Sequence, residues 1–126
     1  MEESVLLIQN SFIFQIDIKE KRRTISIKTD DIIWLEADSN YVKIYTKAGE
    51  YTKKASLKEF ERQLDPNAFV RIHRSAIVNF DSIESMFPYF KEEYIIILKN
   101  EKTLRLSRTY KDKVELILHK IKQKSA

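Results

Sequence analysis

The fold is decided by the stretch Phe69-Val-Arg-Ile-His-Arg-Ser-Ala-Ile-Val-Asn79. Aromatic and β-branched residues at both of its ends favour β-strand. Its middle holds two arginines, a histidine and a serine, and a core strand does not normally tolerate such groups because unpaired buried charge is very costly. The stretch therefore predicts two short strands joined by a junction, His73-Arg74-Ser75, that faces solvent. Such a conflict between local pattern and burial often marks a functional position.

The composition is that of one globular domain. The chain has 126 residues, of which 43% are hydrophobic and 33% charged, so it can build one modest core but not two. A single glycine excludes a glycine-rich phosphate cradle. The chain has no cysteine and only two histidines, which argues against disulfides and structural zinc, and we expect no metal or cofactor.

Neither a membrane span nor a signal peptide is visible in the sequence. The longest uninterrupted apolar run, residues 94–98, is far too short to cross a bilayer. The acidic start Met1-Glu-Glu-Ser does not resemble a signal peptide. The chain is therefore expected to be cytoplasmic by default.

The distribution of charge is more informative than the net charge of +4. Residues 40–80 carry a net charge of +4 and residues 99–126 one of +6, whereas residues 1–39 and 81–98 carry −3 each. A fold that places the two basic segments side by side would have a positive face, as polyanion binders do. The alternative is an ordinary solvated surface of mixed charge.

Alternating apolar and polar residues predict many short strands. The predicted strands cover residues 11–18, 23–28, 32–37, 41–46, 51–54, 83–87, 94–98 and 103–107, in addition to the two strands within 69–79. Gly49, the only glycine, stands where a hairpin favours a positive φ. Because the strands follow one another without the spacing of βαβ units, the sequence predicts a mainly β domain with antiparallel sheets.

Two helices are predicted. Ser56 and Glu59 form a capping box that opens a short helix ending near Leu64. Ser107 is expected to cap a terminal helix. The apolar stripes of the two helices consist of Leu57, Phe60 and Leu64 in the first, and of Tyr110, Val114, Ile117 and Ile121 in the second, with Leu118 beside it.

The sequence shows no sign of enzyme chemistry. His73 and Ser75 could suggest a base and a nucleophile, but no strained elbow, orienting group or oxyanion hole is visible around them. The acidic pairs Asp30-Asp31 and Glu92-Glu93 lie in turn-like segments and are expected to be solvated. We therefore expect a binding protein, not a catalyst.

Polar and basic side chains at strand junctions favour nucleic-acid binding. Arginine matches the acceptor pair on the major-groove edge of guanine, and asparagine matches adenine, while exposed lysines and backbone amides hold phosphates. The candidate loops are Ser39-Asn40 with Lys43, Lys53-Lys54, His73-Arg74-Ser75 and Ser107-Arg108-Thr109. Each has a structural alternative: Asn40 as a turn former, His73 as a half-buried imidazole, and Arg71 or Arg108 paired with Glu36 or Asp112.

Two other functions remain open. A protein-interaction module could use exposed sheet edges, or the stripe Val114, Ile117 and Ile121, as a partner surface. A binder of single-stranded RNA could use Tyr41, Tyr45, Tyr51 and Tyr89 as stacking faces, although tyrosines that alternate in strands more often pack half-buried.

Four segments together resemble the LytTR family of bacterial DNA-binding domains. They are Ile33-Trp-Leu-Glu-Ala-Asp-Ser-Asn-Tyr-Val42, Ser56-Leu57 to Leu64, the stretch 69–79 and Leu106-Ser-Arg-Thr-Tyr110. They follow the order and spacing of the family over residues 14–118, and the block F-x-R-x-H-R-S-x-x-V-N is the most specific. The resemblance implies an elongated stack of antiparallel β-sheets of about ten strands with one short mid-chain helix and a C-terminal helix.

The resemblance also implies a function. Family members bind double-stranded DNA through loops that enter successive major grooves, commonly as response-regulator output domains that bind direct repeats in pairs. Carried over to this sequence, the base-contacting residues are Asn40, His73, Arg74 and Arg108. In the first loop Ser39, Tyr41 or Lys43 could take the role of Asn40, and Arg74 implies a preference for guanine. Phosphate contacts are expected from Lys43, Lys53, Lys54, Ser75 and Lys111.

We expect residues 1–10 to be a lead-in segment or linker remnant, 11–121 the LytTR-like domain and 122–126 a basic tail. The roughly 30 residues before Asp31 leave no room for the receiver domain of a response regulator. The chain is thus either the effector domain of a longer protein or a stand-alone regulator, of the kind that a membrane partner can hold inactive. A homodimer on DNA is possible.

Overall fold

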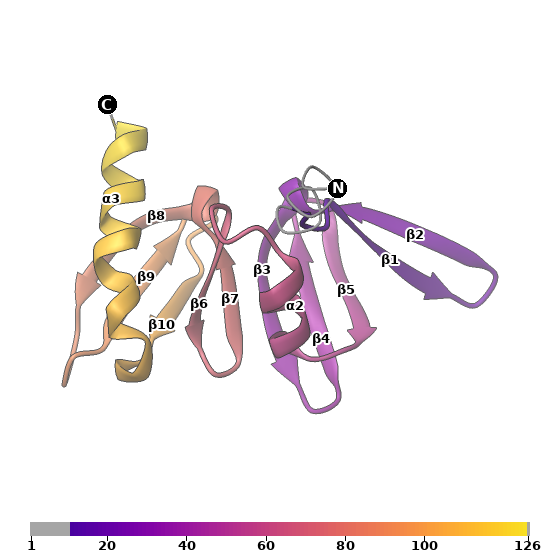
Figure 1. Ribbon diagram of the computed structural model, residues 1–126, viewed down its shortest axis with the longest axis horizontal. Helices are drawn as coiled ribbons and strands as arrows, with labels where there is room; N and C mark the ends of the chain where they lie inside the picture. The colour runs from indigo at the N-terminus through magenta and orange to yellow at the C-terminus, as the bar shows by residue number, and fades with distance from the viewer. Residues whose placement is uncertain (1–10, 126) are drawn as a thin grey trace, which may run out of the picture.

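The computed structural model describes residues 11–125, and the predicted lead-in segment 1–10 lies outside them. Within the described residues the chain forms ten strands in three antiparallel sheets (Figure 1). The first sheet is the hairpin of β1 (Gln15–Glu20) and β2 (Arg23–Lys28). The five-stranded sheet has the order β5-β4-β3-β7-β6 and consists of β3 (Ile32–Asp38), β4 (Tyr41–Thr46), β5 (Gly49–Lys54), β6 (Phe69–His73) and β7 (Ala76–Asn79). The third sheet consists of β8 (Ile83–Pro88), β9 (Tyr94–Leu98) and β10 (Thr103–Leu106).

Short helices connect and cover the sheets. The helix α2 (Leu57–Gln63) lies between β5 and β6, and α3 (Val114–Ser125) follows β10. Three 3₁₀ turns, η1 (Thr29–Asp31), η2 (Phe80–Ser82) and η3 (Arg108–Lys113), link strands or precede α3. Figure 1 shows the sheets side by side along the long axis, with the β1–β2 hairpin at one end and α3 at the other. The predicted mainly β, elongated fold is confirmed.

The junction His73-Arg74-Ser75 within residues 69–79 has the predicted form. β6 ends at His73 and β7 begins at Ala76, and the two strands pair antiparallel. A register shift between Arg71 and His73 lets the turn leave the sheet. At the β4–β5 hairpin Gly49 has φ +151°, in the region that the sequence anticipated for it.

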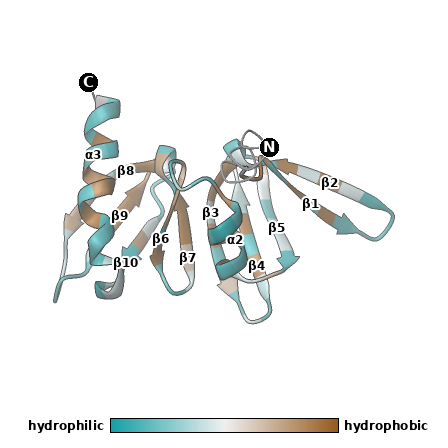
Figure 2. Ribbon diagram, viewed as in Figure 1, coloured by the Kyte–Doolittle hydropathy of each residue, from teal (hydrophilic) through white to brown (hydrophobic). Residues whose placement is uncertain are grey.

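Two hydrophobic cores lie on opposite faces of the five-stranded sheet. Because neighbouring residues in a strand point to opposite faces, Trp34 packs in one core and Leu35 in the other. β7 repeats this arrangement, with Val78 in the first core and Ile77 in the second. The first core joins this sheet to the third sheet and α3, and the second is covered by α2 and the β1–β2 hairpin. Figure 2 shows the hydrophobic residues concentrated in the strands and hydrophilic residues at the β1–β2 and β3–β4 turns.

The first predicted helix cap is confirmed and the second is wrong. Ser56 Oγ accepts a hydrogen bond of 3.2 Å from the backbone N–H of Glu59, as a capping box requires. Ser107 makes no side-chain cap, and it is followed by η3, which is interrupted by non-helical backbone at Tyr110 (φ −107°, ψ 20°), so that α3 begins only at Val114. The apolar stripe of α3 is nevertheless as predicted, since Val114 and Ile117 are buried in the first core.

The first strand is shorter at its start than the sequence predicts, because β1 begins at Gln15, not at residue 11. The backbone before β1 bonds to α2 instead of to a strand: Ile13 N–H donates to the carbonyl of Gln63 over 3.0 Å. At the other end, α3 runs to Ser125 and so includes residues 122–125. Among residues 11–125, no helix has both the length and the apolar character to cross a lipid bilayer.

Candidate nucleic-acid interface

Three polar turns lie at one edge of the molecule. They are the β3–β4 turn at Ser39 and Asn40, the β6–β7 turn at Arg74 and Ser75, and the segment 107–109 after β10 (Figure 1, lower edge). Two backbone hydrogen bonds hold them together: Ala37 N–H donates to the carbonyl of Ser75 over 3.0 Å, and Ser107 N–H donates to that of Ile72 over 2.9 Å. We call these three turns the loop edge. The end of β5 joins it, because Lys54 pairs in register with Tyr41.

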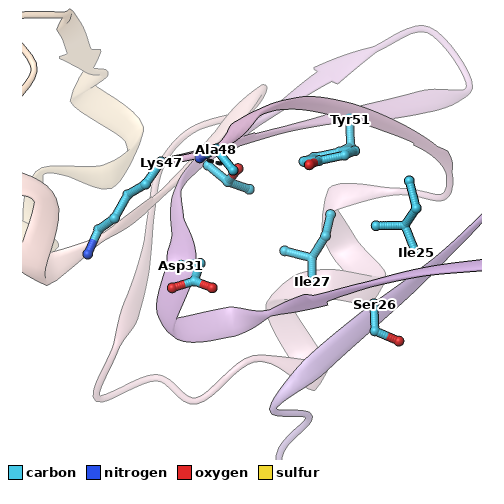
Figure 3. A pocket seen from close by; sticks show the side chains of 8 residues that line it. Ile25, Ser26, Ile27, Asp31, Lys47, Ala48 and Tyr51 are labelled. Carbon is cyan, nitrogen blue, oxygen red and sulfur yellow. Dashed lines mark hydrogen bonds between the residues drawn. The ribbon is translucent and has the colours of Figure 1, made fainter.

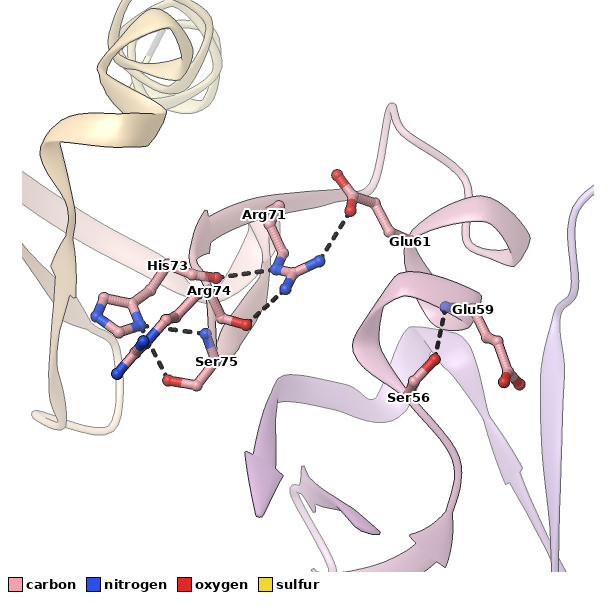
Figure 4. Close-up of polar contacts among 7 residues, drawn as sticks. All are labelled: Ser56, Glu59, Glu61, Arg71, His73, Arg74 and Ser75. Atoms are coloured by element: carbon pink, nitrogen blue, oxygen red, sulfur yellow. Dashed lines mark hydrogen bonds and ion pairs between the residues drawn. The ribbon is translucent and has the colours of Figure 1, made fainter. Parts of the chain in front are cut away.

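The β6–β7 turn is held by Arg71, which points along it from β6 (Figure 4). Arg71 Nε donates to the carbonyl of His73 over 2.9 Å, and Nη2 donates to that of Arg74 over 2.5 Å. Its Nη1 forms an ion pair of 2.9 Å with Glu61 of α2. The side chain of Arg74 is exposed and makes no ion pair or hydrogen bond within the described residues.

The imidazole of His73 has a defined hydrogen-bonding state. The backbone N–H of Ser75 donates to Nδ1 over 3.1 Å, and Ser75 Oγ lies 2.9 Å from the same atom. Since Nδ1 accepts, a neutral imidazole carries its proton on Nε2. Burial, followed by the positive charge of Arg74, lowers the pKa of His73. The ring is half-buried, as the structural alternative anticipated, and Nε2 makes no hydrogen bond within the described residues.

The first and last turns of the loop edge are exposed. Ser39 adopts φ +58°, which places Asn40 at the tip of a two-residue turn. The side chains of Asn40, Lys54 and Arg108 are exposed and make no hydrogen bond or ion pair within residues 11–125. These are the groups with most freedom to contact a ligand.

The other predicted phosphate contacts already have protein partners. Lys53 Nζ donates to the carbonyl of Asp17 over 2.6 Å and so ties the β1–β2 hairpin to β5. Lys43 Nζ lies 3.8 Å from a carboxylate oxygen of Asp38. The hydroxyl of Ser75 already contacts Nδ1 of His73.

Lys111 is also engaged. Its Nζ forms an ion pair of 2.6 Å with Glu92, in the β8–β9 loop. The hydrogen bond from Lys111 lowers the pKa of the Glu92 carboxyl. Lys111 therefore presents less net positive charge at the loop edge than its sequence position suggested.

The alternative ion pairs considered for Arg71 and Arg108 are not found within the described residues. Arg71 pairs with Glu61 and not with Glu36, whose carboxylate accepts a hydrogen bond of 2.8 Å from the hydroxyl of Tyr45. No ion pair joins Arg108 to Asp112 within the described residues. The clamp formed by Arg71 and Glu61 was missed because the two residues are ten positions apart and lie in a strand and a helix. The only sequence signal was the spacing of Arg71 and His73, because residues two positions apart lie on the same face of a strand.

The tyrosines do not form one stacking surface. The ring of Tyr45 lies 4.5 Å from that of Trp34 at an interplanar angle of 8°, so it stacks within the first core. Tyr51 packs partly buried against the second core. Only Tyr41 and Tyr89 are exposed. The stripe proposed as a partner surface has Val114 and Ile117 buried.

A hollow lies between β2 and the β4–β5 hairpin (Figure 3). Its walls include Ile25, Ile27 and Tyr51, and its polar lining includes Asp31 and Lys47. None of the predicted site residues lines it, and the β4–β5 turn lies at the opposite end of the sheet from the loop edge (Figure 1). The loop edge is therefore the place where the predicted residues come together.

Comparison with known proteins identifies the family and the fold. The family model of the LytTr DNA-binding domain matches residues 22–119. A solved structure described as the LytTr DNA-binding domain of a putative methyl-accepting/DNA response regulator from Bacillus cereus superposes with a TM-score of 0.75 at 25% identity, over 84% of this chain and 97% of that one.

Curated relatives share the same region. The sensory transduction protein LytT of Bacillus subtilis is 32% identical over 93 residues, which is 74% of this chain and 39% of LytT. The transcriptional regulatory protein YpdB of Escherichia coli is 33% identical over 85 residues, 68% of this chain and 35% of YpdB. The transcriptional regulatory protein LytR of Staphylococcus aureus is 30% identical over 84 residues, 67% of this chain and 34% of LytR. The chain thus spans less than two fifths of the length of these relatives.

Proposed function

The chain belongs to the LytTR family of DNA-binding domains, and from this premise we propose that it binds double-stranded DNA sequence-specifically, as part of a transcriptional regulator. The observation that carries the proposal is the loop edge. The β3–β4 and β6–β7 turns and the segment after β10 meet there, and each carries an exposed amide or guanidinium side chain that makes no hydrogen bond or ion pair within the described residues. We expect the protein to act as a binder, not as an enzyme.

The proposed reading residues are Asn40, His73, Arg74 and Arg108. A guanidinium can donate two hydrogen bonds to the O6 and N7 atoms of guanine, and a side-chain amide can pair with adenine. His73 would add a single donor through Nε2. The sheets act as a rigid frame that sets the distances between the turns, because a β-sheet packed on both faces deforms little.

For phosphate contacts we propose Lys54 first, because its ammonium group is exposed and unpaired. Lys43, Lys53, Ser75 and Lys111 would have to share or exchange their present partners to bind phosphate. Such contacts set position and contribute salt-dependent affinity, but they do not read sequence.

The setting of the domain is proposed from its relatives. We propose that two copies bind direct repeats, and that the regulator works in the cytoplasm. The domain would serve either as the output domain of a response regulator with a receiver domain, or as a stand-alone regulator controlled by a membrane partner.

The test starts with selection of bound duplexes from a random pool, followed by titration of variants on the selected and on random duplexes. Arg74→Ala should cost about 1–3 kcal/mol on the selected site and relax discrimination there. Lys54→Ala should weaken binding to all duplexes alike and reduce the slope of log K against log salt by about 0.9. Lys47→Ala, in the β4–β5 turn at the opposite end of the sheet, is the control and should bind as the wild type does. Failure to enrich any sequence would refute the proposal.

A further inference from the structure

We propose that Arg71 is a positioning residue that sets the sequence specificity of the β6–β7 turn without touching DNA. This inference rests on the proposed function, because it concerns how the loop edge reads a base. It assigns the clamp of Arg71 and Glu61 a role in recognition beyond the stability of the fold.

The guanidinium of Arg71 holds the turn through hydrogen bonds from its nitrogens. Nε and Nη2 donate to the carbonyls of two successive residues, His73 and Arg74, over 2.9 and 2.5 Å. The third nitrogen, Nη1, donates to Glu61 over 2.9 Å. A planar guanidinium can satisfy three acceptors in fixed directions, whereas an ammonium group cannot reproduce that geometry.

The rest of the turn is also satisfied from within the protein. The N–H of Ser75 donates to His73 Nδ1 over 3.1 Å, and the carbonyl of Ser75 accepts from Ala37 N–H over 3.0 Å. The side chain left without a partner is the exposed guanidinium of Arg74. A turn held in one conformation presents that guanidinium with little further loss of entropy on binding, and this favours affinity and discrimination.

Arg71 itself is poorly placed to contact DNA. Only 12% of its side chain is exposed, and its charge is paired with Glu61. Its guanidinium carbon also lies 6.0 Å from the ring centroid of Tyr110, in the η3 segment that carries Arg108. Arg71 thus joins α2, the β6–β7 turn and η3, so its loss should loosen the turn while the exposed charges of the loop edge stay unchanged.

The experiment compares Arg71→Lys with Arg62→Lys, a matched change at an exposed arginine of α2. Both variants keep the net charge. Affinity for the selected duplex and for a random duplex is measured against salt, and the backbone order of residues 73–75 is measured by ¹⁵N relaxation. For Arg71→Lys we expect about a tenfold loss on the selected duplex, an unchanged affinity and salt slope on the random duplex, and lower order parameters in the turn. Arg62→Lys should match the wild type.

Three results would overturn the inference. Arg71→Lys could keep the wild-type ratio of specific to random affinity. It could instead lower the affinity for both duplexes equally with a shallower salt slope, which would make Arg71 a phosphate contact. It could also leave the order of the turn unchanged while specificity falls. If Arg71→Lys does not fold at the assay temperature, Glu61→Gln provides the test, since it removes only the carboxylate charge that pairs with Arg71. We expect Glu61→Gln to lower the ratio of specific to random affinity by a smaller factor. An unchanged ratio overturns the inference. A wild-type protein without sequence preference would instead refute the proposed function.

Discussion

The backbone N–H of Ser107 donates a hydrogen bond of 2.9 Å to the carbonyl of Ile72. This bond links the end of β10 to β6, and thereby connects the third sheet to the five-stranded sheet at the loop edge. Each partner precedes a proposed reading residue, since His73 follows Ile72 and Arg108 follows Ser107. This backbone hydrogen bond therefore helps to set the spacing between two of the reading turns, together with the packing of β6 and β10 in the first core.

Removal of this donor should lower stability. Ser107 has φ −78°, which a proline can adopt, so Ser107→Pro deletes the N–H with little backbone strain and leaves the carbonyl of Ile72 unpaired. We expect a loss of about 1–3 kcal/mol in the free energy of unfolding, measured by urea titration. Ser107→Ala keeps the N–H and removes a hydroxyl that makes no cap, so it should be close to neutral. Equal losses in the two variants would show that the backbone bond is not the important contact.

Release of Lys111 should strengthen DNA binding. Glu92→Gln removes the carboxylate that pairs with Lys111 over 2.6 Å, and it frees one positive charge beside Arg108. Affinity for any duplex should rise, and the slope of log K against log salt should steepen by about 0.9. Glu84→Gln near the start of β8 makes the same change in net charge at an exposed carboxylate without an ion pair in the described residues. If Glu84→Gln has the same effect, the gain is due to net charge alone and Lys111 is not a contact.

Acid should destabilise the protein through His73. Burial and the charge of Arg74 lower the pKa of this imidazole in the folded state, so the unfolded chain binds the proton first as the pH falls. Stability is therefore full above about pH 6.5, the usual pKa of histidine, and it is lost as the pH falls through the lower folded pKa. Protonation of Nδ1 would also remove the acceptor for the N–H of Ser75.

The measurement is the free energy of unfolding between pH 7.5 and pH 5. His73→Gln should flatten the pH dependence in this range relative to the wild type. A His73→Gln protein with the full wild-type slope would contradict the assignment.

Loss of the α2 cap should weaken both the helix and the clamp that it anchors. Ser56→Ala removes the acceptor for the N–H of Glu59, and such losses typically cost about 0.5–2 kcal/mol. Because Glu61 lies in the same short helix, a frayed α2 should also lower the specific affinity for DNA. Ser56→Asp restores a capping oxygen and should recover most of the stability. A Ser56→Asp protein as unstable as Ser56→Ala would mean that the serine acts in another way.

Much of the fold follows from local sequence. The strands, the Ser56 cap and the turn at His73-Arg74-Ser75 were all predicted, because each depends on residues close together in the chain. The cap predicted at Ser107 failed for a related reason: a serine before an apolar stripe does not reveal that a 3₁₀ turn with a break at Tyr110 intervenes. The start of β1 was also misjudged, since Ile13 is bonded to Gln63 of α2, which the local alternation could not show.

The sequence by itself determined where most of the strands and both helices lie, which side chains each turn carries and the family to which the chain is similar. Only the tertiary structure decided which turns share an edge and which of their charges are free. The order β4-β3-β7-β6, with β10 held against β6, brings together residues from three separate parts of the chain. The same packing pairs Arg71 with Glu61, Lys111 with Glu92 and Lys53 with the carbonyl of Asp17. These pairings span 10 to 36 positions, and they depend on how separate elements dock, for which a one-dimensional pattern holds no signal.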